Sequence, residues 1–302
     1  MSCAGRVVVI TGAGRGLGRS HALALAAAGA KVIVNDLGVS REGASTADQP
    51  AFEVVEEILK AGGEAVASGD DITTWDGAGR VVAQAIARFG RLDVVVNNAG
   101  FVRDRMFVNA TLEEWQATMR VHLDGHFCVT RHATDHWRSR IKGGELPTSV
   151  DARIINTTSG AGLFGSVGQA AYSAAKAGII ALTLVQAAEL SRYGIKANAI
   201  APAARTRMTE VVFASTMERP ESGFDSMSPE HVSPLVVFLA GSGACDVSGR
   251  VFEVQGGKLM VAEGWHTGPG LIVDGPFTSP ELEVGLRAAL ARSRLETPVY
   301  GA

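Results

Sequence analysis

Three cysteines in 302 residues are too few for a disulfide framework. Cys3, Cys128 and Cys245 are also far apart in the chain, as is typical of proteins that work in a reducing compartment. A strand-like run begins just after Arg6, which leaves no room for a charged region followed by an apolar export signal. We therefore expect isolated thiols and a cytoplasmic location.

The chain has no marked excess of charge of either sign. Its 28 basic and 31 acidic residues give a formal net charge of −3, which does not favour a nucleic acid or an anionic membrane as partner. An apolar stretch of about 18 residues without charge or glycine is missing as well, so we expect no membrane span. Small molecules are the expected ligands.

Metal-binding motifs are also missing. The pairs His122/His126 and His132/His136 have a spacing that can bind zinc, but no His-Glu-x-x-His pattern or cysteine pair completes either set. We expect these histidines to lie along different faces of one helix, without a metal.

The sequence does contain short β-branched runs that alternate with longer segments rich in alanine and leucine. Several runs are apolar almost throughout, as in strands covered by helices on both faces. The pattern predicts an α/β fold with a doubly wound parallel sheet of the Rossmann type and helices on both faces. The expected strands span 7–11, 31–35, 64–67, 93–97, 153–158, 196–200 and 251–254, and the expected helices span 16–28, 51–61, 76–89, 111–138, 171–193 and 229–239.

We interpret residues 1–257 as a single dinucleotide-binding and catalytic domain. Residues 258–302 have an irregular pattern and are expected to be a C-terminal extension, packed on the same domain or at a subunit interface. Residues 38–50 look like an insertion, and residues 203–228, which contain Met and Phe side chains, are a candidate substrate lid.

A glycine-rich turn follows the first expected strand. Gly12, Gly16 and Gly18, with Arg15 and Leu17 between them, open the next helix. Backbone N–H groups and the positive helix end can then approach a phosphate without obstruction by Cβ atoms. The position in a strand–turn–helix unit favours a dinucleotide pyrophosphate site over an ordinary glycine turn.

Acidic and small residues follow the next strands. Asp36, 24 residues after Gly12, is placed to accept hydrogen bonds from the adenosine ribose, which favours NAD, whereas Arg15 keeps NADP open as the less favoured cofactor. Other expected contacts are Asp71 to the adenine amino group, with Asp70 as a competitor; Ile72 as an apolar wall; and the turn formed by Asn98, Ala99 and Gly100.

A second cluster suits proton transfer. Tyr172 and Lys176 are four residues apart in an expected helix and therefore share one face. We expect Lys176 to lower the Tyr172 pKa, so that the phenol can exchange a proton near neutral pH. Ser159, at the end of the fifth strand, can donate a hydrogen bond to a developing alkoxide.

Over residues 6–257 these motifs, in this order and spacing, resemble the short-chain dehydrogenase/reductase family. The resemblance implies that hydride moves between a nicotinamide and a substrate carbon, that Tyr172 handles the proton, and that Lys176 also holds the nicotinamide ribose. It further implies cofactor contacts from Pro202 and Thr206, and a homodimer or homotetramer.

The chain also contains the segments Val34-Asn35-Asp36-Leu37-Gly38, Arg103-Asp104-Arg105, Val121-His122-Leu123-x-Gly125, Arg207-Met208-Thr209 and Val251-Phe252-Glu253-Val254. These segments resemble a subfamily, the (3R)-hydroxyacyl-CoA dehydrogenase unit of peroxisomal multifunctional enzyme type 2, also described as a 17β-hydroxysteroid dehydrogenase. His122 stands where the broader family has Asn, and the resemblance implies that its imidazole holds a proton-relay water. The expected function is NAD-dependent oxidation of a 3-hydroxyacyl-CoA. A free steroid alcohol is the second candidate substrate, and a non-catalytic dinucleotide-binding regulator is the alternative of another class.

Overall fold

A computed structural model describes residues 3–38, 49–145, 150–206, 209, 217–272, 275–276, 278–293 and 298–301. Its centre is an eight-stranded sheet in the order β3-β2-β1-β4-β5-β6-β7-β8. All neighbouring strands are parallel except β7 and β8. The strands are β1 (Val7–Thr11), β2 (Lys31–Asn35), β3 (Glu64–Ser68), β4 (Val94–Asn97), β5 (Arg153–Thr157), β6 (Lys196–Pro202), β7 (Val251–Gln255) and β8 (Lys258–Ala262).

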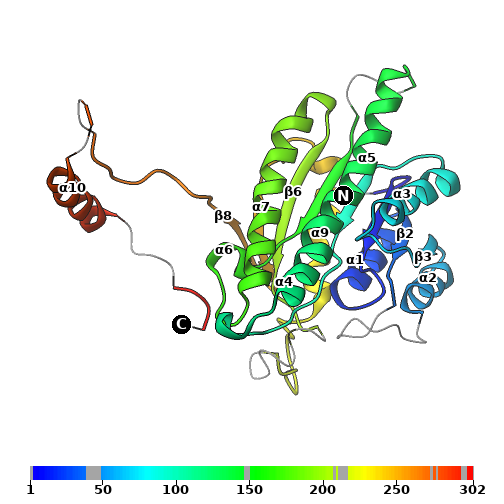
Figure 1. The fold of residues 1–302 in the computed structure, drawn as a ribbon. Coiled ribbons are helices and arrows are strands. Elements are labelled where there is room, and N and C mark those ends of the chain that lie inside the picture. The colour runs from blue at the N-terminus through cyan, green and yellow to red at the C-terminus, as the bar shows by residue number, and fades with distance from the viewer. Residues whose placement is uncertain are drawn as a thin grey trace.

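Helices cover both faces of this sheet (Figure 1). One apolar core joins the sheet to the first group of helices, and a second core joins the opposite face to the other group. The first group is α1 (Gly16–Ala27), α2 (Pro50–Lys60) and α9 (Ser233–Ala240); the second is α3 (Trp75–Phe89), α5 (Gly125–Lys142) and α7 (Ala170–Leu190). The predicted doubly wound α/β fold is confirmed.

The side chains of β1 alternate between the two faces of the sheet, which explains why the two cores are separate. Val8 and Ile10 point into the first core, and Val7 and Val9 point into the second. Successive side chains of a strand face opposite sides, so an uninterrupted apolar strand is stable only where helices cover both faces.

The expected helix over residues 111–138 begins at the predicted capping box. The Thr111 side chain accepts a hydrogen bond from the Glu114 backbone, and the Glu114 side chain accepts one from the Thr111 backbone. The helical segment contains α4 (Leu112–Met119), a π-helical turn (Arg120–Asp124) and α5. Such turns are frequent at functional sites, and this one contains His122.

The extension begins with a strand that its irregular sequence did not predict. β8 pairs antiparallel with β7 and forms one edge of the sheet. Beyond β8 the chain leaves the body of the molecule, and α10 (Ser279–Arg292) stands apart from the sheet (Figure 1). Residues 299–301 are back against the domain, beside the loop between β5 and α7.

Among the described residues, one helical stretch, Ala170–Tyr193, is long and apolar enough to cross a membrane, judged by length and composition alone. It contains α7, which packs along α6 (Gly160–Phe164) and β6 and carries Tyr172 and Lys176. Only 28% of the apolar window in this stretch is buried, so packing against the sheet accounts for only part of its apolar composition.

Candidate active site

The glycine loop lies at the carboxyl end of β1, and its close packing explains its composition. A Cβ atom at Gly12 would lie 2.7 Å from Ala99 Cα, and one at Gly18 would lie 2.1 Å from the Gly12 carbonyl oxygen. Gly12 and Gly16 also have φ angles of +61° and +54°, which favour glycine. Among the described residues, the N-cap Arg15 makes no side-chain capping bond to α1, and the first-turn N–H groups of a helix can donate to a phosphate.

The loop after β4 is tied to the glycine loop by Asn98. Its side-chain nitrogen donates to the carbonyl oxygens of Thr11 and Gly12, at 3.0 Å each. Thr11 Oγ1 in turn accepts from the backbone nitrogens of Asn98 and Ala99 at 3.0 and 3.1 Å. Asn98 therefore holds the two loops together. Thr11 was missed by the sequence analysis, although its position at the end of a buried strand was a signal.

Asp36 follows β2 and faces the glycine loop. Its carboxylate accepts from the backbone nitrogens of Gly14 and Gly38, both at 2.9 Å. A carboxylate has room for further donors, so a ribose hydroxyl can be added to these two bonds. The position fits a dinucleotide whose pyrophosphate lies over the start of α1.

The structure separates the roles of the two candidates for adenine recognition. The Asp70 carboxylate accepts from Arg80 Nε at 2.6 Å and from Ser68 Oγ at 3.1 Å. Asp71 accepts from the backbone nitrogen of Thr73 at 2.9 Å, and the neighbouring Ile72 is buried. Because Asp70 is engaged in an ion pair, Asp71 is the better placed acceptor for an adenine amino group.

Lys176 is buried and fixed by the end of β5. Its Nζ donates to the Thr157 carbonyl oxygen at 2.7 Å, and Thr158 Oγ1 donates to the Lys176 carbonyl oxygen at 2.7 Å. Burial lowers the pKa of Lys176 to about 7. The two threonines beside Ser159 thus hold the lysine and its helix in place, a role that the sequence did not reveal.

Tyr172 lies close to both Ser159 and Lys176. Lys176 Nζ is 5.6 Å from the centroid of the Tyr172 ring. Burial raises the pKa of Tyr172, a hydrogen bond with Ser159 opposes this rise, and the charge of Asp104 adds to it. The expectation that Lys176 lowers this pKa is therefore wrong for this geometry, because the ammonium group is directed at the Thr157 carbonyl and burial dominates.

His122 packs against the other side of Tyr172. The two rings meet edge to face with centroids 5.2 Å apart, and His122 Nε2 lies 2.7 Å from the Phe101 carbonyl oxygen. A Cβ at Gly100 would lie 2.4 Å from the imidazole, which explains the glycine there. Burial, and then the charge of Lys176, lower the His122 pKa well below its usual value, so the ring is neutral at pH 7. Its buried Nδ1 has no hydrogen-bond partner among the described residues.

The segment after β6 reaches the glycine loop at Thr206. A Cβ at Gly16 would lie 3.4 Å from Thr206 Cγ2, and Pro202 ends β6 nearby in sequence. Arg205 then fastens the following segment by two bonds of 2.7 Å to the Asp225 carboxylate. Hydrogen bonding to Arg205 holds the pKa of that carboxyl at about 2.

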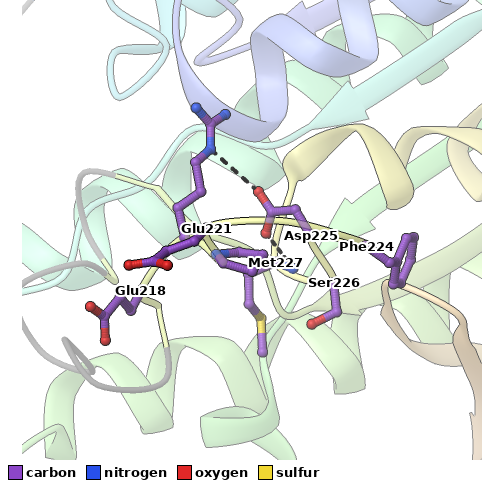
Figure 2. Close-up of a pocket in the computed structure, with 8 residues that line it drawn as sticks. Glu218, Glu221, Phe224, Asp225, Ser226 and Met227 are labelled. Carbon is purple, nitrogen blue, oxygen red and sulfur yellow. Dashed lines mark hydrogen bonds and ion pairs between the residues drawn. The ribbon is translucent and has the colours of Figure 1, made fainter.

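This segment, described from residue 217 onward, forms a pocket of about 390 Å³. Figure 2 shows Met227 in the middle of the lining, with Glu218 and Glu221 on one side of it and Phe224 on the other, beyond Asp225. The lining of this pocket includes neither Ser159 nor Tyr172. Of the expected lid residues, Met217 is buried and Phe224 is 64% exposed, while Met208 and Phe213 lie outside the described residues.

The structure therefore places a Ser, a Tyr and a Lys beside a dinucleotide cradle, at the carboxyl ends of parallel strands. This combination of fold and site defines a class of oxidoreductases that use a nicotinamide dinucleotide. A family model described as "short chain dehydrogenase" matches residues 6–216 of this chain. This chain belongs to the short-chain dehydrogenase family.

Known relatives extend the likeness beyond the matched region. Hydroxyacyl-CoA dehydrogenase ChsB1 of Mycobacterium tuberculosis is 47% identical over 288 residues, which are 94% of this chain and 88% of that protein. Peroxisomal multifunctional enzyme type 2 of Mus musculus is 45% identical over 269 residues, or 89% of this chain, but the match spans only 34% of the mouse protein. The crystal structure of a short chain dehydrogenase from Mycobacterium avium has a TM-score of 0.88 and 51% identity, covering 100% of both chains.

Proposed function

We propose that the protein oxidises the 3-hydroxyl group of an acyl-CoA thioester with NAD. The observation that carries this proposal is that Tyr172 has Ser159 as a hydrogen-bond partner and the buried Lys176 near its ring. The thioester substrate is suggested by hydroxyacyl-CoA dehydrogenase ChsB1, whose match covers most of both chains. The preference for NAD follows from Asp36, whose negative charge would repel the 2′-phosphate of NADP.

In the proposed reaction, bound NAD supplies the hydride acceptor. Ser159 donates a hydrogen bond to the substrate oxygen and orients it toward the phenol. Tyr172, in its deprotonated form, takes the hydroxyl proton and becomes the neutral phenol, while the Thr157 carbonyl holds Lys176 beside the ring. His122 lies against Tyr172 and fixes the ring from the other side; it is the candidate for holding a relay water. Specificity for the acyl-CoA would come from residues other than Ser159, Tyr172 and Lys176.

The test is a spectrophotometric screen for NADH formation. The substrates are 3-hydroxyacyl-CoA thioesters, free steroid alcohols and simple secondary alcohols, each with NAD and with NADP. We expect the thioesters to be turned over with NAD. Turnover of steroid alcohols without any thioester oxidation would reverse the choice of substrate, and NADPH formation in preference to NADH would contradict the role given to Asp36. Cofactor binding without turnover of any substrate would favour a non-catalytic regulator.

A further inference from the structure

The loop that joins Ser159 to Tyr172 is the middle one of three short extended segments. On one side, Arg105 N donates to the Gly168 carbonyl oxygen at 2.7 Å, and the Gln169 side chain donates to Asp104 at 2.7 Å. On the other side lies the segment 299–301. Val167 N donates to the Tyr300 carbonyl oxygen at 2.9 Å, and Tyr300 N donates to the Gly165 carbonyl oxygen at 3.3 Å. Both pairings are parallel β-bridges.

The pairing brings the Tyr300 ring next to Gly160, the residue that follows Ser159. A Cβ at Gly160, the residue after Ser159, would lie 2.8 Å from both Cε2 and the hydroxyl oxygen of Tyr300. Only glycine leaves room for the ring there. Phe164, at the end of the same short helix α6, meets Tyr300 edge to face with the centroids 5.8 Å apart and the planes at 85°. The ring position is thus fixed from two sides.

The Tyr300 side chain is held but not covered. It is 45% exposed, and the preceding Val299 is 41% exposed. Burial, followed by the charge of Glu253 on β7, raises the Tyr300 pKa, so the phenol is neutral at physiological pH. The neutral ring, Phe164 and Val299 therefore present an apolar surface beside Gly160, the residue that follows Ser159. Fixed aromatic rings give such a surface a defined shape.

We propose that Tyr300 is a specificity-determining residue that forms a wall of the substrate site and limits the size of the acyl group. This inference rests on the proposed function, because it assigns the wall to the group attached to the carbinol carbon. The residue that would shape the site around Tyr172 stands 128 positions after it in the sequence. The consequence is that selectivity among acyl groups depends on the ring, whereas proton transfer does not.

The experiment compares wild type, Tyr300→Phe and Tyr300→Ala on 3-hydroxyacyl-CoA thioesters of increasing acyl size. Tyr300→Ala should raise the kcat/KM ratio of large to small acyl groups by about 10-fold or more, since one methylene in an apolar pocket is already discriminated to this degree. Tyr300→Phe keeps the ring and should keep the wild-type ratio. Tyr193→Ala is the matched control, because Tyr193 contacts the opposite end of β5 through the Val150 backbone.

Melting temperature and NAD dissociation constant are measured for each variant. An unchanged size preference in Tyr300→Ala would overturn the inference. An equal loss of kcat/KM for every acyl size would overturn it as well, because this is the result expected if the segment 299–301 has a purely structural role. If wild type oxidises no thioester, the proposed function fails separately. The same variants are then compared on secondary alcohols of graded size that the screen shows to be substrates, and an unchanged size preference there counts against Tyr300 in the same way.

Discussion

Individual side chains in this site do more than one task, and Lys176 shows this most clearly. Its ammonium group is buried, bonded to the Thr157 carbonyl, and close to both Tyr172 and the neutral His122. The low pKa of the lysine, about 7, and the raised pKa of the tyrosine have one common cause, which is removal from water. Proton transfer by Tyr172 must therefore depend strongly on pH.

Tyr172→Phe should lower kcat for alcohol oxidation by about 10³-fold, because the proton acceptor is lost, while NAD still binds. In wild type, oxidation requires the deprotonated phenol, so its rate should rise with pH above neutrality, whereas ketone reduction requires the protonated phenol and should fall at high pH. Steady-state kinetics in both directions measure this, with Tyr193→Phe as the control. Oxidation rates independent of pH would contradict the role of Tyr172.

Asp36→Asn should raise the ratio of kcat/KM with NADP to that with NAD by about 10-fold. The substitution removes the charge that would repel a 2′-phosphate. Because Gly14 and Gly38 donate to different oxygens of the Asp36 carboxylate, the single amide oxygen of Asn keeps one of these two bonds. Initial rates with both cofactors measure the ratio. Asp71→Asn, at the adenine end, should leave it unchanged, and an equal shift in both variants would refute the assignment of Asp36 to the ribose.

Among the elements, helix α3 shows how one side chain supports a binding loop. Its N-cap is Thr74, whose Oγ1 accepts from the Gly77 backbone at 3.1 Å. The same hydroxyl donates to the Asp71 carbonyl oxygen at 2.9 Å. The start of the helix and the loop that carries the candidate adenine contact are therefore joined at one atom.

Thr74→Ala should lower the free energy of unfolding by about 1 kcal/mol, since the first turn of α3 loses its capping acceptor. Urea unfolding measures the change. Thr73→Ala, at the neighbouring position, removes no cap and is the control. A larger loss of stability in Thr73→Ala than in Thr74→Ala would show that the cap is not what stabilises this junction.

At the scale of the whole molecule, distant parts of the chain meet between α1 and α9. His21 on α1 is fully buried, and its Nδ1 lies 2.9 Å from the hydroxyl oxygen of Ser233, 212 residues later. Burial lowers the His21 pKa to about 3. In the unfolded chain, His21 takes up a proton near pH 6.5. The unfolded state thus binds more protons between these two values, and stability falls as pH drops through this window.

His21→Asn should reduce this pH dependence. From pH 6.5 toward pH 4, the free energy of unfolding should fall more steeply in wild type than in His21→Asn. The two slopes should differ by at most about 1.4 kcal/mol per pH unit. Thermal or urea unfolding across this range measures both slopes. His266→Asn, at an exposed position, is the control and should retain the wild-type slope. Equal slopes in wild type and His21→Asn would show that His21 titrates normally in the folded protein.

Local patterns in the sequence were sufficient for the sheet, its covering helices and the capping box at Thr111, because period-two and helical apolar patterns report which faces are buried. They also selected the glycine loop, Ser159, Tyr172 and Lys176, since these side chains lie at strand ends or within one helical turn. The edge strand β8 was missed although Leu259, Met260 and Val261 are apolar, because it is short and lies in an irregular part of the sequence, and these side chains are largely exposed at the edge of the sheet.

Only the tertiary structure decided the protonation of the site and its outer wall. The direction of the Tyr172 pKa depends on how far water is excluded and on where Lys176 points, and neither is encoded in a spacing of four residues. The ion pair of Asp70 with Arg80 joins residues 10 positions apart, and the contact of Tyr300 with Gly160 joins residues 140 positions apart. Such contacts arise from long-range packing, for which neighbours in the chain carry no signal.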